Sequence, residues 1–348
     1  MKILVTGGCG YVGSVLVPSL LKGGHEVVVA DILWFGNYLE PHPNLSVRAA
    51  DIRRAADIPM DGVEVVVHLA NVANDPCAEL DSRLAWEVNA LAAMGLVERA
   101  VAHGVRQFLY SSSGSVYGVK EEPEVTEDLE LVPISDYNKT KMIAERVLLS
   151  YADRIVVQCI RPATVCGLSP RMRLDVAVNL LTAQAAARGE ITVLGGAQTR
   201  PNIHIRDLVR VFEHFIALGD RAAGIYNAGF ENLSILDIAR AVTRHVRAEI
   251  RVAESNDPRS YRLSSKKLTA TGFQPKFSVD HAIREVAEAF RSGRLRDEDR
   301  WYNIRSMKKI PNLDAIPCFD ASHSEASHSD ASNRENCDHR DAKGGCPR

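Results

Sequence analysis

The first thirteen residues constrain the fold more than any other stretch of the chain. A short apolar run, residues 3–5, leads directly into Gly7, Gly10 and Gly13, and apolar residues at helical spacing continue to residue 21. This order predicts a strand, a tight turn and a helix. The glycines permit the turn, the approach of a phosphate to the backbone, and close packing of the helix on the strand. The N–H groups at the helix start favour a pyrophosphate.

A second strand is predicted over residues 26–30, and Asp31 follows it directly. A carboxylate at this place accepts hydrogen bonds from a ribose 2′-OH and repels a 2′-phosphate. We therefore expect a dinucleotide site that prefers NAD to NADP. A purely structural turn in some other α/β protein is the alternative, and the complete order of strand, helix, strand and acid argues against it.

Composition and charge exclude several other classes of protein. The chain has 348 residues, of which 46% are hydrophobic and 25% charged, and its net charge is -2. Nothing here favours a nucleic acid or an anionic membrane as a partner. No apolar run is long enough to span a bilayer and no secretory signal is recognised, so we expect a cytoplasmic protein. The seven cysteines are scattered, which predicts free thiols and no metal site.

Strands and helices alternate along the first half of the chain. Further strands are predicted over residues 45–49, 63–69, 105–110 and 155–160, with helices over 81–102 and 135–151. This alternation predicts an α/β fold with a Rossmann-type, doubly wound parallel sheet. We expect an NAD-binding domain over residues 1–167, with later returns to the sheet, and a smaller substrate-binding part over 168–310. The tail, 319–348, is almost free of apolar residues and is predicted to be disordered.

Three residues that could together transfer a proton follow the predicted strands. Ser113 lies at the end of the strand over 105–110, and Tyr137 and Lys141 are four residues apart on one face of the next helix. A lysine ammonium favours the phenolate of a neighbouring tyrosine and so lowers its pKa, which makes the tyrosine a usable base. A serine hydroxyl can hold the same substrate oxygen. A surface Tyr and Lys pair is the alternative, and the preceding nucleotide turn favours catalysis.

The sequence resembles the extended short-chain dehydrogenase/reductase family, and within it the NAD-dependent nucleotide-sugar epimerases and dehydratases. The matching stretches extend over most of residues 1–310; they are 6–13, Asp31, Asp51-Ile52, 68–70, 111–118, 137–141, 161–163 and 200–207.

The resemblance implies roles for individual residues. Ser113, Tyr137 and Lys141 take the catalytic positions, and Lys141 also holds the nicotinamide ribose. The residues implied to bind NAD are Gly7, Gly10, Tyr11, Val12, Gly13, Asp31, Asp51, Ile52, Leu69, Ala70, Tyr137 and Lys141. Ser113, Asn179, Arg200 and Arg259 are implied to bind a nucleoside-diphosphate sugar. Members of the family commonly form homodimers through a four-helix bundle, to which residues 81–102 and 135–151 would contribute.

Two residues that differ from the family pattern help to choose among the reactions known in the family. The related 4,6-dehydratases have Asp-Glu after the catalytic hydroxyl residue, where this chain has Gly114 and Ser115. Neither transfers a proton usefully at neutral pH, so a C4 epimerisation through a 4-keto intermediate is favoured. A nucleotide-4-keto-sugar reductase that consumes NAD(P)H is the alternative, and a non-catalytic NAD-binding regulator is a third. Cys166 stands where the family has a tyrosine; we expect it to pack in the fold, and a proton donor to a ring carbon is the alternative. We expect His204 to be a structural hydrogen-bonder.

Overall fold

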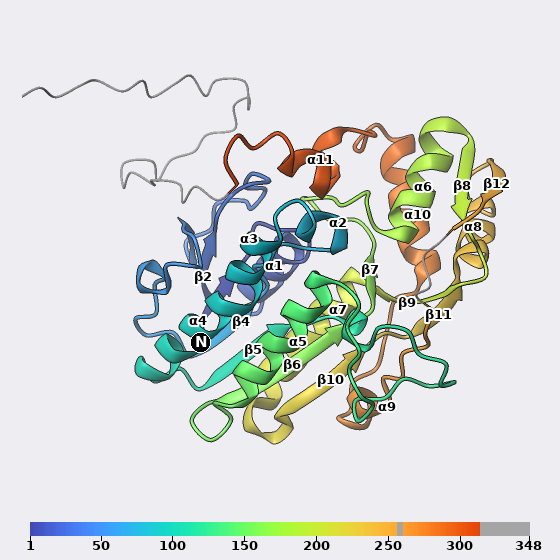
Figure 1. Ribbon diagram of the computed structural model, residues 1–348. Coiled ribbons are helices and arrows are strands. Elements are labelled where there is room, and N and C mark those ends of the chain that lie inside the picture. The colour runs from blue at the N-terminus through green and yellow to red at the C-terminus, as the bar shows by residue number, and fades with distance from the viewer. Residues whose placement is uncertain (256–259, 314–348) are drawn as a thin grey trace, which may run out of the picture. The chain divides into compact units, whose positions relative to one another are not determined.

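The computed structural model describes residues 1–255 and 260–313 (Figure 1). Arg259 and the predicted tail from residue 319 lie outside the described residues. The largest sheet has the strand order β10-β6-β5-β4-β1-β2-β3. Every neighbouring pair in it is parallel, which confirms the predicted Rossmann-type sheet. Its strands are β1 (Lys2–Thr6), β2 (Glu26–Asp31), β3 (Leu45–Ala49), β4 (Val65–His68), β5 (Gln107–Ser111), β6 (Val156–Pro162) and β10 (Gly224–Ala228).

Helices cover both faces of this sheet. Successive residues of β1 point into different cores: Ile3 and Val5 belong to one hydrophobic cluster and Leu4 belongs to another. The first cluster includes apolar residues of α1 (Gly13–Lys22) and α7 (Ile205–Leu218), and the second includes residues of α4 (Ala92–Ala102) and α5 (Asp136–Leu149). Figure 1 shows α4 and α5 on the near side of the strands. Burial on both faces accounts for the unbroken apolar sequence of β4 up to His68.

The strand order places a crevice at the middle of the sheet. The chain proceeds from β1 outward through β2 to β3, and then crosses to β4 on the other side of β1. At such a reversal, the connections leave the carboxyl ends of neighbouring strands in opposite directions and open a crevice between them. Helix α1 begins there, directly after the glycine turn.

The helix predicted over residues 81–102 is divided into three segments. They are α3 (Ser82–Trp86), the π-helix η2 (Glu87–Leu91) and α4. The side chain of Asn89, within η2, accepts a hydrogen bond from Val72 N–H and donates to Val72 O. A π-helical turn is a recognised interruption of an α-helix. Here it coincides with the point at which the helix is fixed to the loop after β4.

The second half of the chain adds smaller sheets and their helices. Strands β7 (Thr164–Cys166), β9 (Thr199–His204) and β11 (Glu231–Ser234) form one sheet, and β8 (Glu190–Leu194) pairs with β12 (Glu249–Ala253). The remaining helices are α2 (Asp75–Ala78), α6 (Ala177–Arg188), α8 (Ile235–Thr243), α9 (Lys266–Ala270), α10 (Val279–Arg291) and α11 (Asn303–Met307). Within the described ranges, no helix has the length and apolar character needed to cross a membrane.

Candidate active site

A cavity of about 510 Å³ lies against the glycine turn and the carboxyl ends of the central strands. Its wall brings together most of the residues selected from the sequence, although they are widely separated along the chain. Those that line it are Gly7, Gly10, Tyr11, Val12, Gly13, Asp31, Asp51, Ile52, Leu69, Ala70, Ser113, Tyr137, Lys141 and Arg200.

The glycine turn has no room for side chains at two of its positions. Gly7 has a φ of +72°, and a Cβ atom there would lie 2.6 Å from the backbone nitrogen of Ala70. A Cβ atom on Gly13 would lie 2.4 Å from the carbonyl oxygen of Gly8. The turn therefore leaves bare backbone and the N-terminus of α1 on the cavity wall. This arrangement fits the pyrophosphate of a dinucleotide.

Two aspartates at strand ends are held in place by local hydrogen bonds. The carboxylate of Asp31 accepts from the N–H groups of Leu33 and Cys9, at 2.8 and 2.9 Å. Burial raises the pKa of Asp31, and these two bonds oppose the rise. Asp51 is buried and forms an ion pair of 2.8 Å with Arg53. Both carboxylates border the cavity, where the sequence places the adenosine end of NAD.

Ser113, Tyr137 and Lys141 also meet at the cavity. Ser113 follows β5 and caps a short 3-10 helix, while Tyr137 and Lys141 lie one turn apart on α5. The Lys141 Nζ atom donates to the carbonyl of Ser111 at 2.8 Å and lies 5.9 Å from the centre of the Tyr137 ring. The three side chains that the sequence singled out for proton transfer therefore border one cavity.

Burial controls the ionisation of this group. It raises the pKa of Tyr137 to about 12, and Asp75 adds to the rise, while Arg173 and a hydrogen bond with Ser113 oppose it. Burial likewise lowers the pKa of Lys141 to about 7, against the attraction of Glu145. The pKa of Tyr137 is thus raised, which is opposite to the lowering expected from the neighbouring Lys141. Desolvation of the phenol is the largest cause of the rise, and the contributions that oppose it come from Arg173 and Ser113.

We expect Lys141→Met to stabilise the cofactor-free protein most strongly at pH 7 and below. The unfolded lysine has a pKa near 10.5 and the folded one near 7, so between these values the unfolded chain binds the extra proton. The contribution of Lys141 to stability therefore rises with pH through this window, and the advantage of methionine shrinks. At pH 7 the gain in the free energy of unfolding from Lys141→Met is on the order of a few kcal/mol. Urea unfolding of both proteins at pH 7 and pH 9 measures this, and an unchanged difference would contradict it.

Other charged residues of the cavity were not assigned roles from the sequence. Arg171 is 1% exposed, and its guanidinium donates to Asn303 Oδ1 at 2.7 Å and stacks 4.0 Å from the centre of the Phe35 ring. Arg173 pairs with Asp175 at 2.9 Å, and both line the cavity near Tyr137. The spacing of two arginines shortly after a strand end was the available signal. It does not reveal which of them faces a ligand.

The residues implied to bind the sugar nucleotide fall in different places. Arg200, on β9, borders the cavity. Asn179 is completely buried: it accepts from Gly167 N–H at 2.9 Å and donates to Arg173 O at 2.9 Å and Tyr11 Oη at 3.0 Å. Its amide is thus engaged within the protein rather than presented to the cavity. Arg259 lies outside the described residues.

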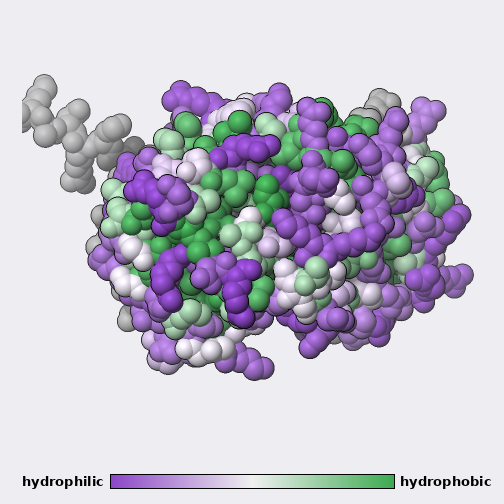
Figure 2. Space-filling model, turned by 90° about the horizontal axis from the view of Figure 1, so that it is seen from below, coloured by the Kyte–Doolittle hydropathy of each residue, from purple (hydrophilic) through white to green (hydrophobic). Residues whose placement is uncertain are grey.

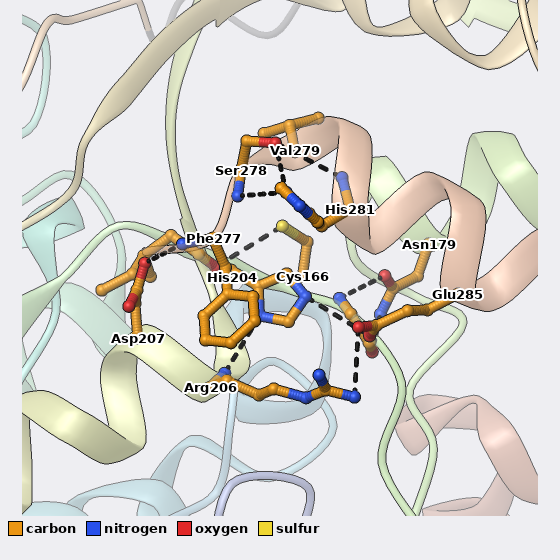
Figure 3. Close-up of polar contacts among 12 residues, drawn as sticks. Cys166, Asn179, His204, Arg206, Asp207, Phe277, Ser278, Val279, His281 and Glu285 are labelled. Atoms are coloured by element: carbon orange, nitrogen blue, oxygen red, sulfur yellow. Dashed lines mark hydrogen bonds and ion pairs between the residues drawn. The ribbon is translucent and has the colours of Figure 1, made fainter. Parts of the chain in front are cut away.

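Cys166 and His204 lie in a separate polar cluster (Figure 3). Cys166 is buried with its thiol 3.5 Å from Ile203 O, and burial raises its pKa. The His204 ring accepts the N–H of Arg206 at the start of α7, and its Nε2 atom lies 3.3 Å from Glu285. Figure 3 shows Glu285 in contact with both His204 and Arg206. These contacts give His204 a capping role and leave the thiol inside the fold.

A glycine turn and a Ser-Tyr-Lys set on one cavity, above a parallel sheet, define the short-chain dehydrogenase/reductase class. Residues 3–229 match the model of the NAD dependent epimerase/dehydratase family, and the chain belongs to this family.

Similar proteins come from several bacteria. A UDP-glucose 4-epimerase of Corynebacterium glutamicum is 29% identical over 320 residues, which cover 84% of this chain and 96% of that protein. The structure of a UDP-glucose 4-epimerase of Thermus thermophilus in complex with NAD matches with a TM-score of 0.73 at 26% identity, covering 84% of this chain and 99% of the other. A dTDP-glucose 4,6-dehydratase of Streptomyces venezuelae matches with a TM-score of 0.77 at 25% identity, covering 84% and 98%. Because the structures of an epimerase and a dehydratase match comparably, structural similarity alone does not separate these two reactions.

Proposed function

We propose that the protein is an NAD-dependent nucleotide-sugar epimerase that inverts C4 through a 4-keto intermediate. The observation that carries this proposal is the meeting of Ser113, Tyr137 and Lys141 in one cavity with the glycine turn. The residues after Ser113 support epimerisation over dehydration, because Gly114 and Ser115 offer no carboxylate or carboxylic acid for the removal of water. The relatives named as UDP-glucose 4-epimerases agree with this choice.

Each residue has a defined task in the proposed reaction. Bound NAD would supply the hydride acceptor and donor. Tyr137 takes the proton from the C4 hydroxyl and returns it after the keto sugar has turned in the cavity. Ser113 donates a hydrogen bond to the same oxygen. Lys141 holds the nicotinamide ribose, and its charged form favours the phenolate of Tyr137.

The two parts of the chain have separate roles in this proposal, one for the cofactor and one for the substrate. We propose that residues 1–167, with β10, bind NAD, and that 168–310 bind a nucleoside diphosphate. Arg200 suits the diphosphate because a guanidinium matches phosphate oxygens. For Asn179 we propose an indirect role: it fixes the segment between Gly167 and Arg173 that borders the cavity. The role of Arg259 remains the one implied by the resemblance. We expect the enzyme to act in the cytoplasm.

The test is a reaction with a panel of nucleotide sugars that includes UDP-glucose and UDP-galactose. We expect purified protein to carry NAD and to interconvert a pair of C4 epimers without net consumption of cofactor. Continuous oxidation of added NADH or NADPH by a keto sugar would instead assign the protein as a reductase. Bound NAD without any turnover across the panel would favour the non-catalytic regulator.

We also propose a homodimer formed through α4 and α5. Hydrophobic residues reach the surface, and Figure 2 shows a group of them bordered by hydrophilic ones on the face seen from below. Among the large exposed apolar side chains of the described residues are Leu91 in η2, Met94 in α4 and Ile143 in α5, which are 60%, 42% and 37% exposed. Two copies of these helices together would form a four-helix bundle that buries these three side chains.

Leu91→Glu combined with Met94→Glu should convert the dimer into a monomer, because two carboxylates from each copy would enter an apolar interface. Light scattering after size-exclusion chromatography measures the mass. Val252→Glu is the matched control, since Val252 is 59% exposed on β12, outside the proposed interface. A wild-type monomer at micromolar concentration, or a double variant that stays dimeric, would refute this interface.

A further inference from the structure

Asn138 directly follows the tyrosine of the Ser-Tyr-Lys set and is completely buried. Its side chain joins two hydroxyl groups of the loop after β5. The Ser115 hydroxyl lies 2.5 Å from Asn138 Oδ1, and the Ser113 and Ser115 oxygen atoms are 2.7 Å apart. The N–H of Ser115 also donates to Ser113 Oγ at 3.1 Å. A continuous chain of hydrogen bonds therefore runs from the Asn138 amide to Ser113.

Counting hydrogens gives the direction of this chain. A serine hydroxyl has one hydrogen to donate. When Ser115 donates its hydrogen to Asn138 Oδ1, the bond between the two serines must be donated by Ser113. The Ser113 hydrogen then points at Ser115, and none is left for a substrate oxygen.

Within the part of the chain that the structure describes, the nitrogen of the Asn138 amide lacks the hydrogen-bond acceptor that its buried position requires. Asn138 Nδ2 is buried and has no hydrogen-bond partner among the described residues. A buried N–H group without an acceptor is more costly than a carbonyl with unused acceptor capacity. A half-turn of the amide exchanges its nitrogen and oxygen in the same space. The nitrogen then donates to Ser115, and the carbonyl takes the unpartnered position.

We propose that Asn138 is a positioning residue that sets Ser113 as a hydrogen-bond donor. With the amide nitrogen facing Ser115, the Ser115 hydroxyl donates to Ser113, and the Ser113 hydrogen is free for the sugar oxygen beside Tyr137. The two bonds that Ser113 accepts polarise its own O–H and strengthen its donation. This inference rests on the proposed epimerase reaction, in which Ser113 holds the C4 oxygen in both the alcohol and the ketone.

Two substitutions at residue 138 separate this role from a merely structural one. In Asn138→Asp the ionised side chain only accepts, so it takes the Ser115 hydrogen and turns Ser113 away from the substrate. We expect kcat to fall about a hundredfold with little change in KM, as for the loss of one donor to a developing oxyanion. Asn138→Leu has a similar size and no acceptor, so Ser115 stays free to donate and kcat should fall only a fewfold.

A second-site change tests the direction of the chain. Ser115→Ala in the Asn138→Asp background removes the acceptor of the Ser113 hydrogen, so we expect it to restore kcat markedly. A carboxylate that acted only through its charge on Tyr137 would leave the double variant as slow as Asn138→Asp. Equal losses in Asn138→Leu and Asn138→Asp would mean that the amide only packs, and would overturn the proposal. Urea unfolding identifies a variant that has lost its fold; if this is Asn138→Asp, a hundredfold loss of kcat in a folded Asn138→Leu would overturn the proposal.

A measurement without substrate keeps this proposal apart from the proposed function. The phenolate absorbance of Tyr137, obtained by pH titration against Tyr137→Phe, reports whether Ser113 donates to that oxygen. We expect the pKa of Tyr137 to be higher in Asn138→Asp than in Asn138→Leu, and to fall again in the double variant. If this order holds in a protein that epimerises no sugar of the panel, the reaction assignment fails and the hydrogen-bond chain stands. If the enzyme is active but the order is absent, the chain fails.

Discussion

Tyr137→Phe should reduce the epimerisation rate by a factor of about 10³ while the protein keeps its NAD, because proton transfer by a positioned side chain contributes about 10²- to 10⁴-fold to a rate. The phenol is half-buried on the cavity wall beside Ser113, and the change removes only the oxygen that carries the proton. The ring itself remains, so packing and cofactor binding should change little. Turnover of a nucleotide sugar and the NAD released on denaturation are the two measurements.

Tyr151→Phe is the control for this change. Tyr151 follows the end of α5, and its hydroxyl donates to Glu98 at the surface, away from the cavity. It should retain wild-type turnover. A Tyr137→Phe protein with NAD bound and a rate close to that of the wild type would show that another group moves the proton. Loss of NAD together with activity would instead point to a binding role for the phenol.

Glu145→Ala should destabilise the protein by about 3–5 kcal/mol, because it leaves the Arg161 guanidinium buried without a counterion. Arg161 and Glu145 are at most 2% exposed and form two parallel hydrogen bonds of 2.9 and 2.6 Å between β6 and α5. Arg161 also donates to Tyr117 Oη at 2.7 Å. Unfolding in urea, followed by circular dichroism, measures the free energy difference.

A double variant tests whether the unpaired charge of Arg161 causes the loss of stability. In Glu145→Ala/Arg161→Met no unpaired charge remains, so the double variant should recover part of the lost stability. Arg188→Ala breaks a more exposed pair with Asp297, and we expect little change from it. If the double variant is less stable than Glu145→Ala alone, the loss comes from packing around Arg161 and not from its charge.

The sequence allowed prediction of the fold wherever the signal is local. The turn over residues 7–13 and the apolar strands are encoded in neighbouring residues, so their order identified the Rossmann-type sheet. The seventh strand, β10, was not located, because its place beside β6 depends on pairing with a segment far back along the chain. The π-helical interruption at Asn89 also depends on a distant partner, the backbone of Val72.

The candidate site also has residues that local spacing predicts and properties that arise only in the folded protein. Ser113, Tyr137 and Lys141 were selectable because spacing alone brings the last two to one face of a helix. The burial that raises the pKa of Tyr137 and lowers that of Lys141 is a property of the assembled cavity, and it makes the shift of the tyrosine opposite to the expected one. The role proposed for Asn138 could not be predicted from the sequence, because it depends on the contact that its amide makes with Ser115 in the folded protein.

The phenol of Tyr11 connects two parts of the molecule that the proposed reaction uses separately. It belongs to the glycine turn, yet it donates to Gly167 O at 2.7 Å and accepts from Asn179 at 3.0 Å. We therefore expect a shift of the turn to move the segment that carries Arg171 and Arg173. Ligand occupancy on one side of this link should change the affinity on the other, and thermodynamic reciprocity requires the factor to be equal in both directions.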